Sequence, residues 1–190
     1  MPKDIFEIRL HGRGGQGAKT AAAVLAEAAM ESGKYVQSFP EYGAERQGAP
    51  MKAFTRISDK KILLHTGVTN PDLVAVFDPT LLKSIRVAEG LDEQNGVLIA
   101  NTSQGVEDVR QLTGFKGRIV VLDAVKIALE ELGKPITNTA MLGAIEKATN
   151  IVDYEELKKH LYDHFVHDLG KDIADKNINA FVRAYNEVKL

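Results

Sequence analysis

The apolar positions of the chain predict a succession of short strands and longer helices. Residues 5–10 alternate apolar and polar side chains, as a half-buried strand does, and residues 35–39 are predicted to form a second strand. Nearly continuous apolar runs at residues 73–77, 96–100 and 118–122 are typical of strands that are buried on both faces. Helical segments are predicted at residues 18–32, 81–88, 125–132, 137–148, 154–165 and 171–188.

The order of these segments predicts the fold class. Strands that alternate with helices favour an α/β fold in which a mostly parallel sheet lies between two helical layers, a three-layer αβα arrangement. Residues 51–57 and 61–65 resemble two short strands joined by a turn at residues 58–60, so one antiparallel hairpin is expected. The C-terminal third of the chain is predicted to be helical.

Length and composition favour one cytoplasmic domain. A chain of 190 residues without a linker-like segment is expected to form a single domain over residues 1–190. Its 24 basic and 26 acidic residues are dispersed, which argues against a general affinity for nucleic acid or for a membrane surface. The chain has no apolar run of membrane-spanning length and no signal core. Without cysteine it can hold neither a disulfide nor a cysteine-ligated iron–sulfur cluster.

A glycine-rich loop joins the first strand to the first helix. It contains Gly12, Arg13, Gly14, Gly15, Gln16 and Gly17. Glycine tolerates positive φ and lets backbone N–H groups approach a ligand closely. The N-terminus of the following helix adds further N–H groups and the positive end of its dipole. Strand, glycine loop and helix in this order therefore predict a site for an anion.

Three alternatives for this loop differ in what they require of its surroundings. A dinucleotide site needs an acidic residue directly after the next strand, but Glu41 is displaced by Pro40, and the expected hairpin interrupts the parallel crossover. A nucleoside-triphosphate loop needs Gly-Lys-Thr, whereas Ala18 intervenes before Lys19. The third alternative is a tight turn that only lets the helix pack closely against the sheet.

A second loop, residues 41–50, has no periodicity and is rich in functional groups. It includes Tyr42, Gly43, Glu45, Arg46 and Gly48. It begins where the second strand is expected to leave the sheet, at the same edge as the glycine loop. A guanidinium offers paired donors, so Arg13 or Arg46 would suit a phosphate or a carboxylate. An internal ion pair, of Glu45 with Arg46 or of Glu41 with Arg13, is an equal alternative.

The remaining polar residues provide no self-sufficient catalytic set, and no catalytic residue is assigned. Asn101 and Asp123 follow buried strands, at the carboxyl edge where open α/β folds place ligands. His160, His164 and His167 share one helical face at a spacing that can bind a metal. Their charged neighbours favour a solvated face instead, and no metal site is expected.

Four segments taken together resemble the gamma subunit of 2-oxoacid:ferredoxin oxidoreductases, most closely of those that act on pyruvate. These segments are HGRGGQGAKT, FPEYGAERQGAP, AFTRIS and NPDLVAVFD, and the resemblance continues through PITNTAMLGAI to the C-terminus. The combination of G-x-G-G-Q-G with Y-G-A-E-R-x-G-A-P is far more specific than either motif. By position, Gly12, Gly14, Gly15, Gln16 and Gly17 match the family's glycine loop, and Tyr42, Gly43, Glu45, Arg46 and Gly48 match its second loop.

The resemblance implies a non-catalytic subunit of a heterotetramer that also contains alpha, beta and delta subunits. Such complexes oxidatively decarboxylate a 2-oxoacid with coenzyme A and reduce ferredoxin. Thiamine diphosphate, Mg²⁺ and the iron–sulfur clusters are expected on the other subunits. We expect the two loops to form a rim of the coenzyme A path or of an interface with the catalytic subunits. An autonomous dinucleotide-binding enzyme and a pure assembly module are the alternatives.

Overall fold

The computed structural model describes residues 4–43 and 48–190, which are organised around a six-stranded sheet. The strands are β1 (Ile5–Arg13), β2 (Tyr35–Tyr42), β3 (Pro50–Ser58), β4 (Leu73–Val76), β5 (Val97–Asn101) and β6 (Arg118–Leu122). Their order across the sheet is β2-β3-β1-β4-β5-β6. The ladder from β1 through β4 and β5 to β6 is parallel, and β3 alone runs antiparallel to both of its neighbours. The predicted α/β fold with a mostly parallel sheet is confirmed.

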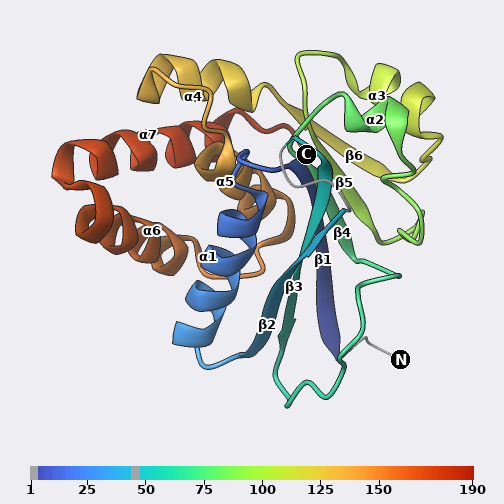
Figure 1. Ribbon diagram of the computed structural model, residues 1–190, viewed down its shortest axis with the longest axis horizontal. Coiled ribbons are helices and arrows are strands. Elements are labelled where there is room, and N and C mark those ends of the chain that lie inside the picture. Colours follow the sequence, from blue (N-terminus) through green and yellow to red (C-terminus); the bar gives the residue numbers. More distant parts are fainter. Residues whose placement is uncertain (1–3, 44–47) are drawn as a thin grey trace.

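Helices cover both faces of the sheet (Figure 1). They are α1 (Ala18–Glu31), α2 (Leu81–Ser84), α3 (Val106–Thr113), α4 (Ala124–Leu132), α5 (Asn138–Thr149), α6 (Tyr154–Leu169) and α7 (Lys171–Glu187). One face packs against α1 and α5, on which α4, α6 and α7 pack in turn, and these five helices form the larger apolar core with the sheet. The other face packs against α2 and α3 and forms a smaller core. The three-layer arrangement and the helical C-terminal third are therefore as predicted.

The antiparallel hairpin lies elsewhere than the sequence predicts. It consists of β2 and β3, with Phe39 opposite Phe54, and the long loop between them is its connection. Residues 61–65 form no strand; the side-chain amide of Gln37 donates to the carbonyl of Leu64 at 2.9 Å and holds this segment beside β2. The short turn at residues 58–60 favours a hairpin in the sequence prediction, but of the three apolar residues that follow it only Ile62 is buried, whereas Leu63 and Leu64 are exposed. Helix α3, with Val109 as its only buried residue, has no counterpart in the sequence prediction.

Two buried arginines fasten irregular segments to the face of the sheet opposite α1. Arg56 is 1% exposed, and its Nε lies 2.9 Å from Oε1 of Glu7. Arg9 donates to the carbonyls of Val68 and Val87, at 3.3 and 3.0 Å. A guanidinium presents several donors in a fixed plane, which lets one side chain satisfy carbonyls from separate segments. Ordered chain thus covers a part of the sheet where no helix lies.

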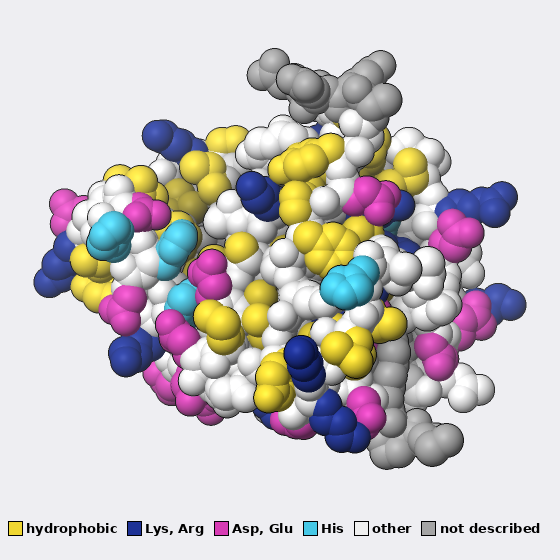
Figure 2. All heavy atoms as spheres, turned by 60° about the horizontal axis from the view of Figure 1, so that its bottom comes forward, with side chains coloured by type: hydrophobic (Ala, Val, Ile, Leu, Met, Phe, Trp, Pro, Cys, Tyr) yellow, Lys and Arg dark blue, Asp and Glu magenta, His cyan; other side chains and the backbone are white. Residues whose placement is uncertain are grey.

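The surface does not segregate its charges on the face shown in Figure 2, where basic and acidic side chains are interspersed. None of the helices in residues 4–43 and 48–190 combines the length and the apolar character that crossing a membrane requires.

Glu146 is a carboxyl group buried on α5, with a residue exposure of 1%. Its Oε2 accepts the N–H of Val152 at 3.3 Å, whereas Oε1 has no hydrogen-bond partner among the described residues. Burial raises the pKa of Glu146 from 4.5 to about 7; the Val152 hydrogen bond opposes the rise, and the charge of Asp153 adds to it. The folded protein therefore favours the protonated form, and the free energy of unfolding falls as the pH rises through this interval.

Replacing Glu146 with glutamine is expected to stabilise the protein by about 1–3 kcal/mol at pH 8 and to change little at pH 5. Glutamine keeps the shape and an acceptor oxygen but has no charge to bury. Urea unfolding at the two pH values measures the difference, with the exposed Glu93→Gln as the matched control. Equal effects of Glu146→Gln at both pH values would show that the buried group does not ionise between them.

Candidate functional site

The two predicted loops begin at the same edge of the sheet. Because β3 is antiparallel to both β1 and β2, the latter two strands point in the same direction. Arg13 at the end of β1 lies opposite Pro50, and Tyr42 at the end of β2 lies opposite Met51. The chain segments that follow β1 and β2 therefore start at the same edge of the sheet, on either side of β3, as expected. Two residues of the second loop, Glu45 and Arg46, lie outside the described residues.

The glycines of the first loop fall into two structural roles. Gly17 caps α1 with φ 82°, and a Cβ atom there would lie 2.8 Å from Cβ of Asn138. Gly12 is also tightly packed, since a Cβ atom there would lie 3.1 Å from Cβ of Ala18. By contrast, Gly15 has φ 93° and a Cβ atom there would meet nothing within 4 Å, and Gly14 is exposed. Close packing thus explains Gly12 and Gly17, while Gly14 and Gly15 form the open tip of the loop.

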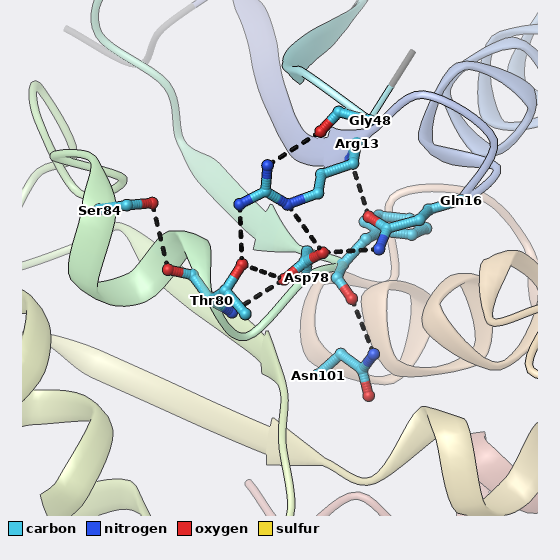
Figure 3. A network of polar contacts seen from close by, with 8 residues as sticks. Arg13, Gln16, Gly48, Asp78, Thr80, Ser84 and Asn101 are labelled. Atoms are coloured by element: carbon cyan, nitrogen blue, oxygen red, sulfur yellow. Dashed lines mark hydrogen bonds and ion pairs between the residues drawn. The ribbon is translucent and has the colours of Figure 1, made fainter.

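Arg13 joins the glycine loop to the second loop (Figure 3). Its Nη1 donates to the carbonyl of Gly48 at 2.9 Å, and its Nη2 donates to Oγ1 of Thr80 at 3.0 Å. Its Nε lies 3.2 Å from Oδ2 of Asp78. The alternative ion pair of Arg13 with Glu41 is wrong, since Glu41 pairs with Lys52 at 3.2 Å. These guanidinium contacts are internal, and they hold Gly48 against the end of β1.

Asp78, which follows β4, is the centre of this network (Figure 3). Oδ2 accepts the side-chain amide of Gln16 at 2.7 Å, and Oδ1 accepts the backbone N–H of Thr80 at 2.9 Å and its hydroxyl at 2.6 Å. Oε1 of Gln16 in turn accepts the backbone N–H of Arg13 at 2.7 Å. Burial would raise the pKa of Asp78, but the hydrogen bonds from Thr80 and Gln16 and the charge of Arg13 outweigh it. The net effect lowers the pKa, so Asp78 is ionised at neutral pH and orders the glycine loop.

The polar residues at the ends of β5 and β6 have structural roles in this arrangement. The side chain of Asn101 donates to the carbonyl of Phe77 at 2.8 Å and accepts the N–H of Ala124 at 3.0 Å. Asp123 caps α4 by accepting the N–H of Lys126 at 2.9 Å. Both residues lie at the carboxyl edge as predicted. Their side chains form hydrogen bonds with backbone groups at strand ends and helix starts of this chain.

The strand order weighs against a dinucleotide site. In such a site the strand after the first helix continues the parallel sheet next to the first strand. Here β3 lies between β1 and β2 in the reverse direction. The acidic candidate Glu41 lies on β2, two positions away in the sheet from the glycine loop, and pairs with Lys52. The sequence analysis expects a hairpin of residues 51–57 and 61–65, whereas the hairpin consists of β2 and β3. Either hairpin interrupts the parallel crossover that a dinucleotide site needs.

The histidines of α6 differ in their surroundings. His160 lies between two carboxylates of α1, with ring nitrogens 3.3 Å from Glu27 and 3.0 Å from Glu31, and its side chain is 13% exposed. The predicted solvated face is therefore wrong for this residue, because α1 packs against α6. His164 and His167 are more exposed and lie near Asp168. Within the described residues, no three histidine or acidic side chains are grouped so as to hold a metal ion.

Sequence reasoning missed Asp78 as the organising residue of the edge. The only signal was its position directly after a buried strand, next to Pro79. Its partners Arg13 and Gln16 are more than sixty positions earlier in the chain, as the separation of 62 residues between Gln16 and Asp78 shows. Parallel pairing of β4 with β1 brings them together.

Comparison with known proteins agrees with this architecture. Residues 7–187 match the family described as pyruvate ferredoxin/flavodoxin oxidoreductase. The pyruvate synthase subunit PorC of Thermotoga maritima is 52% identical over 189 residues, which cover 100% of this chain and 97% of that protein. The pyruvate/ketoisovalerate oxidoreductases common subunit gamma of Pyrococcus furiosus is 47% identical, with 98% of each chain covered. A crystal structure of pyruvate oxidoreductase subunit PORC from Thermotoga maritima superposes with a TM-score of 0.88 at 50% identity, covering 98% of each chain.

The chain belongs to the pyruvate ferredoxin/flavodoxin oxidoreductase family. Within that family, the predicted gamma subunit of a pyruvate or 2-oxoacid oxidoreductase complex is confirmed, and an autonomous dinucleotide-binding enzyme is not favoured.

Proposed function

We propose that the two-loop edge of this gamma subunit forms a rim of the coenzyme A path in the assembled oxidoreductase. The edge consists of Gly12 to Gly17 and of Tyr42, Gly43, Glu45, Arg46 and Gly48. The complex would convert pyruvate and coenzyme A to acetyl-CoA and carbon dioxide and pass the electrons to ferredoxin. This chain would bind and orient the anionic part of coenzyme A while the other subunits perform the chemistry.

The observation that carries this proposal is the hydrogen bond from Arg13 to the carbonyl of Gly48. It fixes the start of one loop against the end of the other, so that both face the same edge of the sheet. Next to this contact, Gly14 and Gly15 are exposed, as are Lys19 and Thr20 in the first turn of α1. Exposed backbone N–H groups at a helix N-terminus favour an anion, and coenzyme A carries several phosphate charges.

The division of labour in the proposed complex rests on the family resemblance and agrees with the composition of this chain. A protein without cysteine provides no thiolate for an iron–sulfur cluster. The resemblance implies that the clusters, thiamine diphosphate and Mg²⁺ lie on other subunits, and we assign them to alpha, beta and delta partners. We also propose that residues 1–190 form one domain and that the complex works in the cytoplasm.

The choice of 2-oxoacid is proposed to lie on other subunits. The Pyrococcus furiosus relative is named as a gamma subunit common to pyruvate and ketoisovalerate oxidoreductases. A gamma chain shared between two substrates supports a role that does not depend on the 2-oxoacid side chain. Pyruvate is the substrate proposed here because it occurs in the names of both relatives.

Replacing Arg46 with alanine is expected to raise the KM for coenzyme A by about tenfold or more, the loss of one charge-assisted hydrogen bond, with little change in the KM for pyruvate. Steady-state kinetics of the purified complex measure both constants. Arg118→Ala, at the amino end of β6 and away from the two-loop edge, is the matched control.

A second role for the same edge is an interface with the catalytic subunits. Tyr42 is 57% exposed beside the second loop, which favours a contact surface. In that case Arg46→Ala would lower the yield of assembled complex and leave the KM for coenzyme A unchanged in the complex that remains. Unchanged assembly together with unchanged kinetics would refute both roles for Arg46.

A further inference from the structure

A cavity of about 260 Å³ lies beside the two-loop edge, next to β1 and β3 and to the segment that follows α2. Its wall is formed by His11, Pro50, Met51, Lys52, Ile85, Arg86 and Glu89. His11 precedes the glycine loop directly and is not part of the two motifs that define the edge. All of these residues lie in the described part of the chain.

His11 places a buried hydrogen-bond donor in this wall. The Nε of Arg9 donates to Nε2 of His11 at 3.0 Å, so Nε2 is the acceptor and the ring proton lies on Nδ1. His11 is 2% exposed, and its Nδ1 has no hydrogen-bond partner among the described residues. Burial, with the charges of Arg9 and Lys52, lowers the pKa of His11 to about 3, so the ring is neutral at physiological pH. A buried donor of this kind is costly unless an acceptor meets it.

The charged residues of the wall favour an anion. Lys52 and Arg86 contribute two positive charges, against the one negative charge of Glu89. Nζ of Lys52 forms an ion pair with Oε1 of Glu41 at 3.2 Å. No carboxylate of the described residues lies within ion-pair distance of Arg86. A cation is a poor ligand for this cavity, because the lone pair on Nε2 of His11 already accepts the hydrogen bond from Arg9. Donors and positive charge together suit oxygen atoms that carry negative charge.

We propose that this cavity binds an oxyanion, the carboxylate or phosphate group of a small molecule, with Arg86 and Lys52 as its cations and His11 Nδ1 as a neutral donor. Nδ1 itself exposes almost no surface, so an oxygen atom contacts it only after side chains of the wall shift. The site is distinct from the proposed role of the two loops, because its proposed ligand contacts, Arg86, Lys52 and His11, are not among the residues of the two-loop edge. Its oxyanion is either a free phosphate or carboxylate or a phosphate group of coenzyme A.

The test is a titration of the full chain followed by NMR of histidine labelled with nitrogen-15. Inorganic phosphate, acetate and coenzyme A are added in separate experiments, and the Nδ1–H signal of His11 is observed. We expect a saturable shift of this signal and an affinity about tenfold lower in Arg86→Gln. Arg86 is exposed, so this variant is expected to fold. Lys60→Gln, which removes an exposed lysine paired with Asp4, is the control and should bind like the wild type.

The three ligands distinguish the source of the oxyanion. A shift with phosphate or acetate supports a site for a free small anion, and a shift with coenzyme A alone supports a subsite for that molecule. The proposal is overturned if no ligand shifts the His11 signal, or if Arg86→Gln binds as tightly as the wild type. Unchanged coenzyme A kinetics in Arg46→Ala would refute the role of Arg46 and would leave this proposal standing.

Discussion

Replacing Gly17 with alanine is expected to lower the free energy of unfolding by about 2–4 kcal/mol. A non-glycine residue at φ 82° is strained, and the new Cβ atom would lie 2.8 Å from Cβ of Asn138. Asn138 begins α5 and is itself buried, so relief of this contact requires α5 to move away from α1. Chemical denaturation of the full chain measures the loss.

Gly15→Ala is the matched control for this prediction. Gly15 has a similar φ of 93°, but a Cβ atom there meets nothing within 4 Å. The backbone strain alone should cost about 1–2 kcal/mol. The difference between the two variants therefore isolates the packing contact with Asn138. Equal losses for both glycines would show that the close approach of α5 does not constrain the loop.

Replacing Arg56 with leucine is expected to destabilise the protein by about 3–5 kcal/mol, a range typical of breaking a buried ion pair. The guanidinium is 1% exposed and also donates to Oε1 of Gln37 at 3.2 Å and to the carbonyl of Gly67 at 3.3 Å. The variant leaves the carboxylate of Glu7 without this partner and releases the segment around Gly67. Urea unfolding checks the stability, and hydrogen exchange of residues 59–72 checks the release.

Two further variants separate charge from packing at this position. The double variant Glu7→Gln with Arg56→Leu should be more stable than Arg56→Leu alone, because position 7 then carries no charge that has lost the guanidinium of Arg56. Lys34→Ala, which breaks an exposed ion pair with Asp59, should cost less than about 1 kcal/mol. If Arg56→Leu were as mild as Lys34→Ala, the buried guanidinium would not hold the irregular segment in place.

The parts of the fold that could be predicted from the sequence are those set by local patterns. Strands β4, β5 and β6 are short apolar runs, and α1 has apolar residues at helical spacing ended by Gly33. The pairing of β3 with both β1 and β2 could not be predicted in the same way. Pairing depends on contacts between distant segments, and the short turn at residues 58–60 offered a local but false alternative.

The candidate site shows the same limit. The sequence identifies both loops by their glycines and charged residues and places them at one edge of the sheet. It does not identify Asp78 as the partner of Arg13, since that contact exists only once β4 lies beside β1. Nor does it separate the glycines required by packing, Gly12 and Gly17, from the exposed Gly14 and Gly15. The functional proposal for the edge depends on this separation, because only exposed backbone can meet a ligand.

The most direct test of the proposed role is photo-crosslinking of the assembled complex with a coenzyme A analogue that carries a photoreactive group near its phosphates. Peptide mapping of the crosslinked complex locates the label. If the two-loop edge lines the coenzyme A path, the label appears in residues 12–20 or 42–50 of this chain and is competed away by coenzyme A. A competed label found exclusively on other subunits would contradict that role.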